Sequence, residues 1–220
     1  MDAMQRTDGR RKRLAAGGCL ALALLLLLLL VIGARAAVFS ETTDKQTQNG
    51  NVTIDTGNKD QGYFLIKHAG SKKRLKVLVT APNGVKAQYD LNGNGEFEPF
   101  SFPYGNGSYK VAVLQNIEKN RYAYVYSTTL HVNMPDPSLA FLCPNQYVMY
   151  TPLSAAVAKS YELCEGLTDD GEKARRIYEY VSTHVLYDYI KAMTVAQRTG
   201  YLPNVDETLL TGMGVCFDYA

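Results

Sequence analysis

The chain has 220 residues, of which 46% are hydrophobic, and a formal net charge of +2. This length is sufficient for one large or two modest domains. The first 36 residues contain six basic and two acidic side chains, so they carry +4 and the remaining residues carry −2. Because nucleic-acid binding requires a basic surface, this distribution predicts no nucleic-acid partner for residues 37–220.

Residues 1–36 have the pattern of a signal peptide or a membrane anchor. Four consecutive basic residues, Arg10–Arg13, precede an apolar run at residues 14–34. A basic end stays in the cytoplasm, while an apolar segment partitions into lipid. Small residues at Ala34 and Ala36 predict cleavage by a signal peptidase before Ala37. The alternative is an uncleaved anchor, because the apolar run is nearly long enough to cross a bilayer.

Either interpretation places the rest of the chain outside the cytoplasm, as a secreted or membrane-anchored protein. Residues 37–50 are polar and aperiodic, which predicts a flexible linker between the membrane and the first domain. In an oxidising compartment Cys143 and Cys164 can form a disulfide, which leaves Cys216 as the odd thiol. The alternative is that Cys143 and Cys164 are two separate buried cysteines.

Residues 51–133 predict an antiparallel β-sandwich domain of immunoglobulin-like size. Five segments are rich in apolar and β-branched residues, at 51–55, 63–67, 75–80, 109–114 and 122–132. Turn sequences rich in Asn, Pro and Gly lie between several of them. Short strands at this spacing are typical of sandwiches. The segment contains no tryptophan and no cysteine, so a true antibody-type domain is not predicted.

The segment that starts at Asp90 begins like a calcium-binding loop. Asp90, Asn92 and Asn94 place oxygen-bearing side chains at the first, third and fifth positions, and Gly95 follows at the sixth. The twelfth position of such a loop requires a bidentate carboxylate, and here it is Ser101. A hairpin turn is therefore predicted in place of a calcium site. No metal and no other cofactor is predicted for the chain.

Met134–Pro137 marks a domain boundary, and two amphipathic helices are predicted after it. The first opens at Thr151-Pro152 and ends at Gly166. Its apolar face comprises Leu153, Val157, Tyr161 and Cys164. The second begins after the capping sequence Thr168–Asp170. Its predicted buried face comprises Ala174, Ile177, Tyr178, Val181 and Val185. Together with the strands, these helices make the predicted fold class α+β.

The three histidines of the chain are the obvious candidates for a catalytic base. His68 and His131 fall in the predicted sandwich, and His184 falls on the second helix. A base must lie within hydrogen-bond distance of its nucleophile, and the sequence establishes this for none of them. No two histidines share metal-ligand spacing with an acid or a cysteine, so a zinc site is not predicted.

Cys216 is the candidate catalytic residue. It follows Gly212 and Gly214, which permit a tight turn, and precedes residues that can open a helix. Free N–H groups at a helix start favour a thiolate and can stabilise an oxyanion. The alternative is an inert buried cysteine. Asp218 opposes the thiolate charge, so it is interpreted as a cap or a packing partner.

Two segments around Cys216 resemble the nucleophile region of the transglutaminase-like superfamily. They are Gly200–Leu209 and Gly214–Ala220, and the preceding residues 177–181 and 187–189 are similar to the helix and extended segment that lead into that region. Bacterial secreted members of the superfamily resemble this chain in layout: a leader, a β-rich domain and a papain-like catalytic domain. The resemblance implies that Cys216 is the nucleophile and that residues 138–220 form a partial transglutaminase-like domain.

The mechanism implied by this resemblance is thiol attack on an amide carbonyl, followed by resolution of the acyl-enzyme by an amine or water. The family's His and Asp follow the cysteine, whereas no residue follows Ala220 and His184 precedes Cys216. We therefore expect a fragment without catalytic activity, whose parent acts on an extracellular protein or peptide substrate. The alternative function is an extracellular binding module, in which the sandwich is the working part and the catalytic domain is vestigial.

Overall fold

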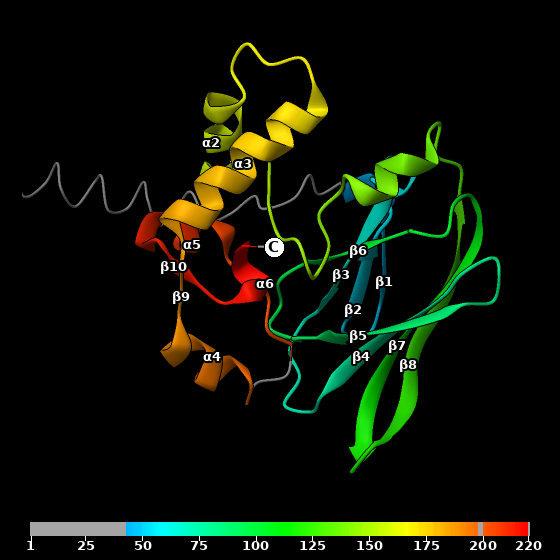
Figure 1. Cartoon of the computed structure of the whole chain (residues 1–220). Helices are drawn as coiled ribbons and strands as arrows, with labels where there is room; N and C mark the ends of the chain where they lie inside the picture. Colours follow the sequence, from blue (N-terminus) through cyan, green and yellow to red (C-terminus); the bar gives the residue numbers. More distant parts are fainter. Residues whose placement is uncertain (1–42, 198–199, 220) are drawn as a thin grey trace, which may run out of the picture. The chain divides into compact units, whose positions relative to one another are not determined.

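The computed structural model describes residues 43–197 and 200–219, which form an α+β structure with antiparallel sheets and several helices (Figure 1). The predicted signal peptide or anchor at residues 1–36 lies outside the described residues. Within the described ranges, no helix combines the length and the apolar character that crossing a membrane requires. The described residues fall in one compact unit.

The first sheet has the strand order β1-β2-β3-β6, and every pair is antiparallel. Its strands are β1 (Gln46–Asn49), β2 (Val52–Asp55), β3 (Tyr63–His68) and β6 (Glu98–Ser101). β2 and β3 are almost fully buried, which suits their apolar, β-branched sequences. Strand β1 lies within the predicted linker at residues 37–50, so the sheet begins before residue 51. The residues of β1 are polar, so their composition does not predict a strand. Pairing with β2 stabilises β1 in the sheet.

The second sheet has the strand order β5-β4-β7-β8 and is also antiparallel. Its strands are β4 (Leu75–Thr80), β5 (Lys86–Leu91), β7 (Gly107–Glu118) and β8 (Arg121–Val132). In β4, buried and partly exposed residues alternate, as expected for a strand with one face on a core. β5 is an edge strand of this sheet, and its residues Gln88, Tyr89 and Asp90 line a pocket.

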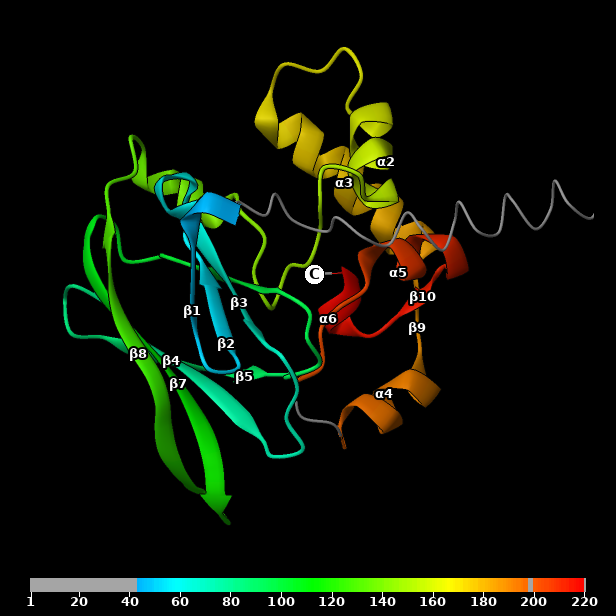
Figure 2. The same cartoon turned by 180° about the vertical axis from the view of Figure 1, so that it is seen from behind.

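One hydrophobic core lies between the two sheets, which Figure 2 shows as two layers. Phe64 of β3 stacks on Phe100 of β6 and on Phe102, with ring centroids 5.6 and 4.8 Å apart. Val77 of β4 and Val111 of β7 face the same core and are completely buried. The strands predicted from residues 51 to 132 are therefore present, whereas the immunoglobulin-like assignment stays a prediction.

The predicted hairpin between Asp90 and Glu98 is wrong. Asp90 belongs to β5 in the second sheet, and Glu98 belongs to β6 in the first, so the segment crosses from one sheet to the other. The turn residues Gly93 and Gly95 have positive φ, as the sequence suggested. Turn-forming residues fix local backbone conformation, but they do not determine which sheet the next strand joins.

Three 3₁₀ helices flank the sheets: η1 (Thr43–Lys45), η2 (Lys59–Gln61) and η3 (Pro137–Phe141). Gly62 packs so closely on η3 that an added Cβ would lie 2.7 Å from the backbone of Ala140. Cys143 follows η3 and is buried, and its thiol donates to the carbonyl of Ala140 at 3.2 Å. Cys143 and Cys164 are both free thiols, so the alternative of two separate cysteines applies in this structure.

The C-terminal part of the described chain is mainly helical. It contains α2 (Ala155–Leu163), α3 (Asp170–His184), α4 (Tyr189–Val195), α5 (Val205–Thr211) and α6 (Cys216–Tyr219). The short strands β9 (Leu186–Tyr187) and β10 (Met213–Gly214) pair in parallel. The predicted cap of the second helix is confirmed, because the Asp169 side chain accepts a hydrogen bond from the Glu172 N–H at 2.9 Å.

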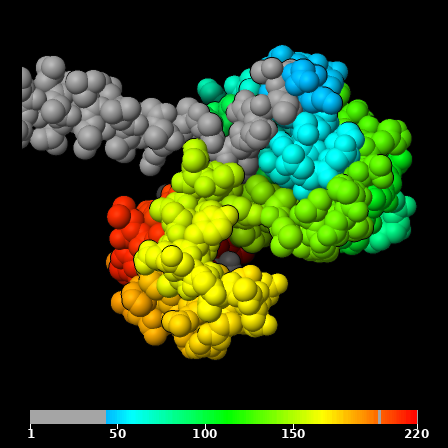
Figure 3. All heavy atoms as spheres, turned by 90° about the horizontal axis from the view of Figure 1, so that it is seen from above, coloured from blue at the N-terminus to red at the C-terminus, as the bar shows by residue number. Residues whose placement is uncertain are grey.

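The predicted start of the first helix and the predicted buried face of the second are wrong. Leu153 is 83% exposed and precedes α2, which begins after Ser154 and not at Thr151-Pro152. On α3, Ile177 and Tyr178 are 37% and 71% exposed, and no residue of the helix is buried. Both helices lie at the surface (Figure 3). An apolar stripe predicts burial only where another element covers it. The stripes are covered only in part, since Val157, Cys164, Val181 and Val185 are half-buried.

Amide hydrogen exchange is therefore expected to be slowest in the central strands β4 and β7 and faster in α3. The amides of Val77 and Val111 lie in a packed sheet, whereas α3 has a solvated backbone and no buried residue. Exchange followed by mass spectrometry of peptic peptides measures this contrast. Equal protection of α3 and β7 would contradict it.

Candidate functional site

Cys216 is exposed and begins α6, beside α5 and β10 (Figure 1). It lines a pocket of about 400 Å³. The walls of this pocket come from distant parts of the sequence: β4 and β5 of the second sheet, residues 146–147, α4, and residues 200–201 and 215–217. The thiol of the predicted nucleophile is thus accessible from a cavity large enough for part of a peptide or a small molecule.

The backbone before Cys216 is fixed by the short parallel ladder of β9 and β10. The N–H of Leu186 donates to the carbonyl of Gly212 at 2.8 Å, and the N–H of Asp188 donates to the carbonyl of Gly214 at 2.9 Å. These contacts attach the cysteine segment to the chain that follows α3. The sequence resemblance had selected both stretches, and the structure places them side by side.

Gly212 and Gly214 have different roles in the turn that leads to Cys216. Gly212 ends α5 in the left-handed conformation, with φ of +64°. Gly214 is required because of close packing: an added Cβ would lie 2.9 Å from Thr208 Cγ2 and 3.1 Å from Asp218 Cβ. The sequence correctly indicated a tight turn, but only the first glycine uses a positive φ.

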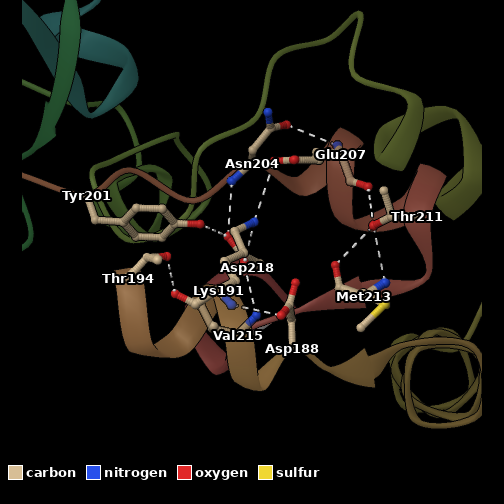
Figure 4. Close-up of polar contacts among 10 residues, drawn as sticks. All are labelled: Asp188, Lys191, Thr194, Tyr201, Asn204, Glu207, Thr211, Met213, Val215 and Asp218. Atoms are coloured by element: carbon tan, nitrogen blue, oxygen red, sulfur yellow. Dashed lines mark hydrogen bonds and ion pairs between the residues drawn. The ribbon is translucent and has the colours of Figure 1, made fainter. Parts of the chain in front are cut away.

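Asp218 organises a cluster of polar contacts that includes Val215, the residue before Cys216; Figure 4 shows this cluster. Its Oδ1 accepts hydrogen bonds from the Tyr201 hydroxyl at 2.5 Å and from the Asn204 N–H at 3.3 Å. Its Oδ2 accepts from the Val215 N–H at 2.9 Å and pairs with Lys191 Nζ at 3.0 Å. Because Val215 precedes the first residue of α6, the bond to its N–H has the geometry of one half of a capping box.

The charge of Asp218 is retained although its side chain is buried. Burial by itself would raise the pKa of Asp218, but hydrogen bonds from Tyr201, Val215 and Lys191 outweigh this effect and lower it. The same ion pair raises the pKa of Lys191 against the opposing effect of its own burial. The interpretation of Asp218 as a cap or packing partner therefore fits the structure. Lys191 and Tyr201 were not selected from the sequence.

A series of aromatic contacts connects the core between the two sheets with Phe217, the residue after Cys216. The ring of Tyr89 in β5 lies 5.5 Å from that of Phe100 and 6.2 Å from that of Tyr147. The ring of Tyr147 in turn lies 5.7 Å from that of Phe217. Such edge and tilted contacts contribute roughly 0.5–1.5 kcal/mol each beyond area burial. They hold α6 beside β5, and no local sequence pattern indicates this contact.

None of the three histidines lines the pocket that contains Cys216 in the described part of the chain. His68 is buried in β3, where its ring nitrogen accepts from the Gly70 N–H at 3.3 Å. His131 contacts Ser108, and His184 stacks on Tyr180 with centroids 4.3 Å apart. Over residues 43–197 and 200–219, no cluster of three potential metal ligands occurs.

Part of the chain, including Cys216, is similar to a known protein family. Residues 155–220, from α2 through Cys216, match the family model of a transglutaminase-like domain. No curated protein matches the chain. The segment that carries the candidate nucleophile is therefore similar to transglutaminase-like domains, which agrees with the resemblance found in the sequence.

Proposed function

We propose that Cys216 is the nucleophile of a cysteine-dependent acyl transfer or amide hydrolysis on protein or peptide substrates. The observation that carries this proposal is the exposed cysteine in a pocket, within the segment that matches a transglutaminase-like domain. The leader pattern at residues 1–36 supports the further proposal that this chemistry takes place outside the cytoplasm, on a secreted or membrane-anchored protein.

The chemistry begins when the thiolate of Cys216 attacks a substrate carbonyl carbon and forms a tetrahedral intermediate. Collapse of the intermediate expels the leaving group and leaves a thioester on Cys216, which an amine or water then resolves. An amide substrate requires a proton for its leaving nitrogen, whereas a thioester substrate expels a thiolate that needs none. The described residues provide no histidine in the pocket to supply that proton. We therefore expect these residues to undergo acylation by a thioester without turnover of an amide.

A thioester probe tests the role of Cys216. Incubation of the chain with the benzyl thioester of N-acetylglycine is expected to add one acyl group, located on Cys216 by mass spectrometry of tryptic peptides. Cys216→Ala is expected to abolish this adduct. Cys164→Ala, which removes a partly buried thiol outside the pocket, serves as the matched control and is expected to leave it unchanged. Equal acylation of Cys164 and Cys216 in the unmodified chain would refute the proposal.

A further inference from the structure

Strand β5 has an open edge at the pocket of Cys216. β5 pairs with β4 along one side only, because it is the edge strand of its sheet. In an antiparallel strand, the N–H and C=O groups of alternate residues point to opposite sides. Either the odd-numbered or the even-numbered residues of β5 therefore direct their backbone groups away from β4, and only those residues can bind another strand.

Two hydrogen bonds show which residues of β5 direct their backbone groups toward β4 and which direct them away. The carbonyl of Val85, just before β5, accepts from the Ala81 N–H at 2.8 Å, so residues of odd number face β4. The carbonyl of Asp90 accepts from Gln146 Nε2 at 2.7 Å, on the side away from β4. The backbone groups of Lys86 and Gln88 therefore point to the open edge. Within the described ranges, no other segment pairs with that edge at these two residues.

The open part of this edge and the thiol share one cavity. Gln88 and Cys216 both line the same pocket of about 400 Å³, and Gln88 is exposed. Three residues of extended chain span about 10 Å, which is comparable to the width of such a cavity. The aromatic contacts from Tyr89 through Tyr147 to Phe217 keep the edge and the nucleophile together. At the far end of β5 the edge is occupied, because Gln146 Nε2 donates to the carbonyl of Asp90 at 2.7 Å. Just beyond β5, a Cβ added at Gly200 would lie 2.5 Å from Asn92 Oδ1.

We propose that the edge of β5 at Lys86–Gln88 binds the backbone of an extended acyl-donor peptide and presents its reactive group to Cys216. The inference rests on the proposed function and adds its substrate class: a flexible, extended polypeptide segment in place of a folded surface or a small amide. Main-chain pairing supplies the affinity, as in other complexes formed by strand addition. The pocket beside Cys216 accepts the side chain that carries the acyl group.

A reactive peptide tests this inference. The probe is an N-acetylated, C-amidated heptapeptide of alternating Ala and Thr whose central side chain carries a chloroacetamide. Attack by the Cys216 thiolate on its methylene carbon forms a thioether and releases chloride. Iodoacetamide, which has no peptide backbone, reports the intrinsic reactivity of the thiol. For each reagent, the rate of modification is followed on the tryptic peptide that contains Cys216.

The variant Gln88→Pro removes the outward N–H of the edge, and proline is tolerated at such edge positions. We expect it to slow the reaction with the peptide about tenfold while the iodoacetamide rate stays unchanged. Gln88→Ala shortens the same side chain but keeps the N–H, so it is the matched control, and the peptide is expected to react with it about tenfold faster than with Gln88→Pro. Urea unfolding of both variants verifies that the fold is retained.

Three results would overturn the inference. One is an equal peptide rate in Gln88→Pro and Gln88→Ala. Another concerns the backbone of the peptide. If every second backbone nitrogen of the peptide is methylated, in either register, and the unmodified chain still prefers the peptide over iodoacetamide, the inference is wrong. The third is a dimer in sedimentation that Gln88→Pro dissociates, which would assign the edge to a second copy of the chain. Failure of the thioester probe to acylate Cys216, with the peptide effect intact, would refute the catalytic proposal and leave the peptide site standing.

Discussion

Replacing Asp218 with alanine is expected to lower the free energy of unfolding of the helical part by about 3–5 kcal/mol. The buried carboxylate satisfies the N–H groups of Val215 and Asn204, the hydroxyl of Tyr201 and the ammonium of Lys191. Without it, the N–H groups of Val215 and Asn204 lose this acceptor in a place that water reaches poorly, and Lys191 keeps only its longer ion pair with Glu207. The turn that presents Cys216 should therefore loosen first, since Val215 directly precedes it.

Glu207 provides the matched control for this substitution. Its Oε2 lies 3.5 Å from the same Lys191 Nζ, but its side chain is 54% exposed. Glu207→Ala is expected to change stability by less than about 1 kcal/mol, because exposed ion pairs contribute little. Urea unfolding followed by far-UV circular dichroism measures both variants. Similar losses in Asp218→Ala and Glu207→Ala would show that Asp218 does not hold this region together.

The second large effect is a pH dependence that originates at Glu98. This side chain is 2% exposed in β6, and it accepts hydrogen bonds from the Asn92 N–H and from Gln146 Nε2, both at 2.7 Å. Burial raises its pKa from 4.5 to about 7, the nearby charge of Asp90 adds to this, and the two hydrogen bonds offset part of it. The folded protein therefore holds the Glu98 proton more tightly than the unfolded chain does.

The contribution of Glu98 to stability is fully present below pH 4.5 and is lost as the pH rises through about 7. The shift corresponds to about 3 kcal/mol. The variant Glu98→Gln cannot ionise, so the difference in unfolding free energy between it and the unmodified chain isolates this group. Between pH 4.5 and pH 7.5, the unfolding free energy of Glu98→Gln relative to that of the unmodified chain is expected to rise by about 3 kcal/mol. A difference that is constant over this range would show that Glu98 is not buried as the structure has it.

Much of the secondary structure was predictable because it depends on neighbours in sequence. The apolar segments at 63–67 and 75–80 became β3 and β4 with nearly the same bounds. Asp169 capped α3 as predicted, since a cap needs only the next three residues. By contrast, the polar strands β1 and β5 were missed, because what stabilises them is pairing with a neighbouring strand and not their own composition.

The residues of the candidate site also fall into two groups: those that the sequence indicates and those that only the fold brings together. Cys216 was selected from a sequence motif, and its catalytic role stays a prediction that the thioester probe addresses. Lys191 carried no signal in the sequence, since a lysine on a short helix is usually solvated. Tyr201 lay within the segment of resemblance, but its contact with Asp218 depends on the fold of the chain between them.

The sequence by itself determined the apolar strands, the cap of α3 and which cysteine follows a tight turn, because these properties arise from local residue preferences. Only the tertiary structure decided that Asp218 joins Lys191 and Tyr201, that Ile177 and Tyr178 of α3 stay exposed, and that β5 borders the thiol pocket. Burial and hydrogen-bond partners depend on residues far apart in the chain, and their free energies appear only once the fold brings those residues together.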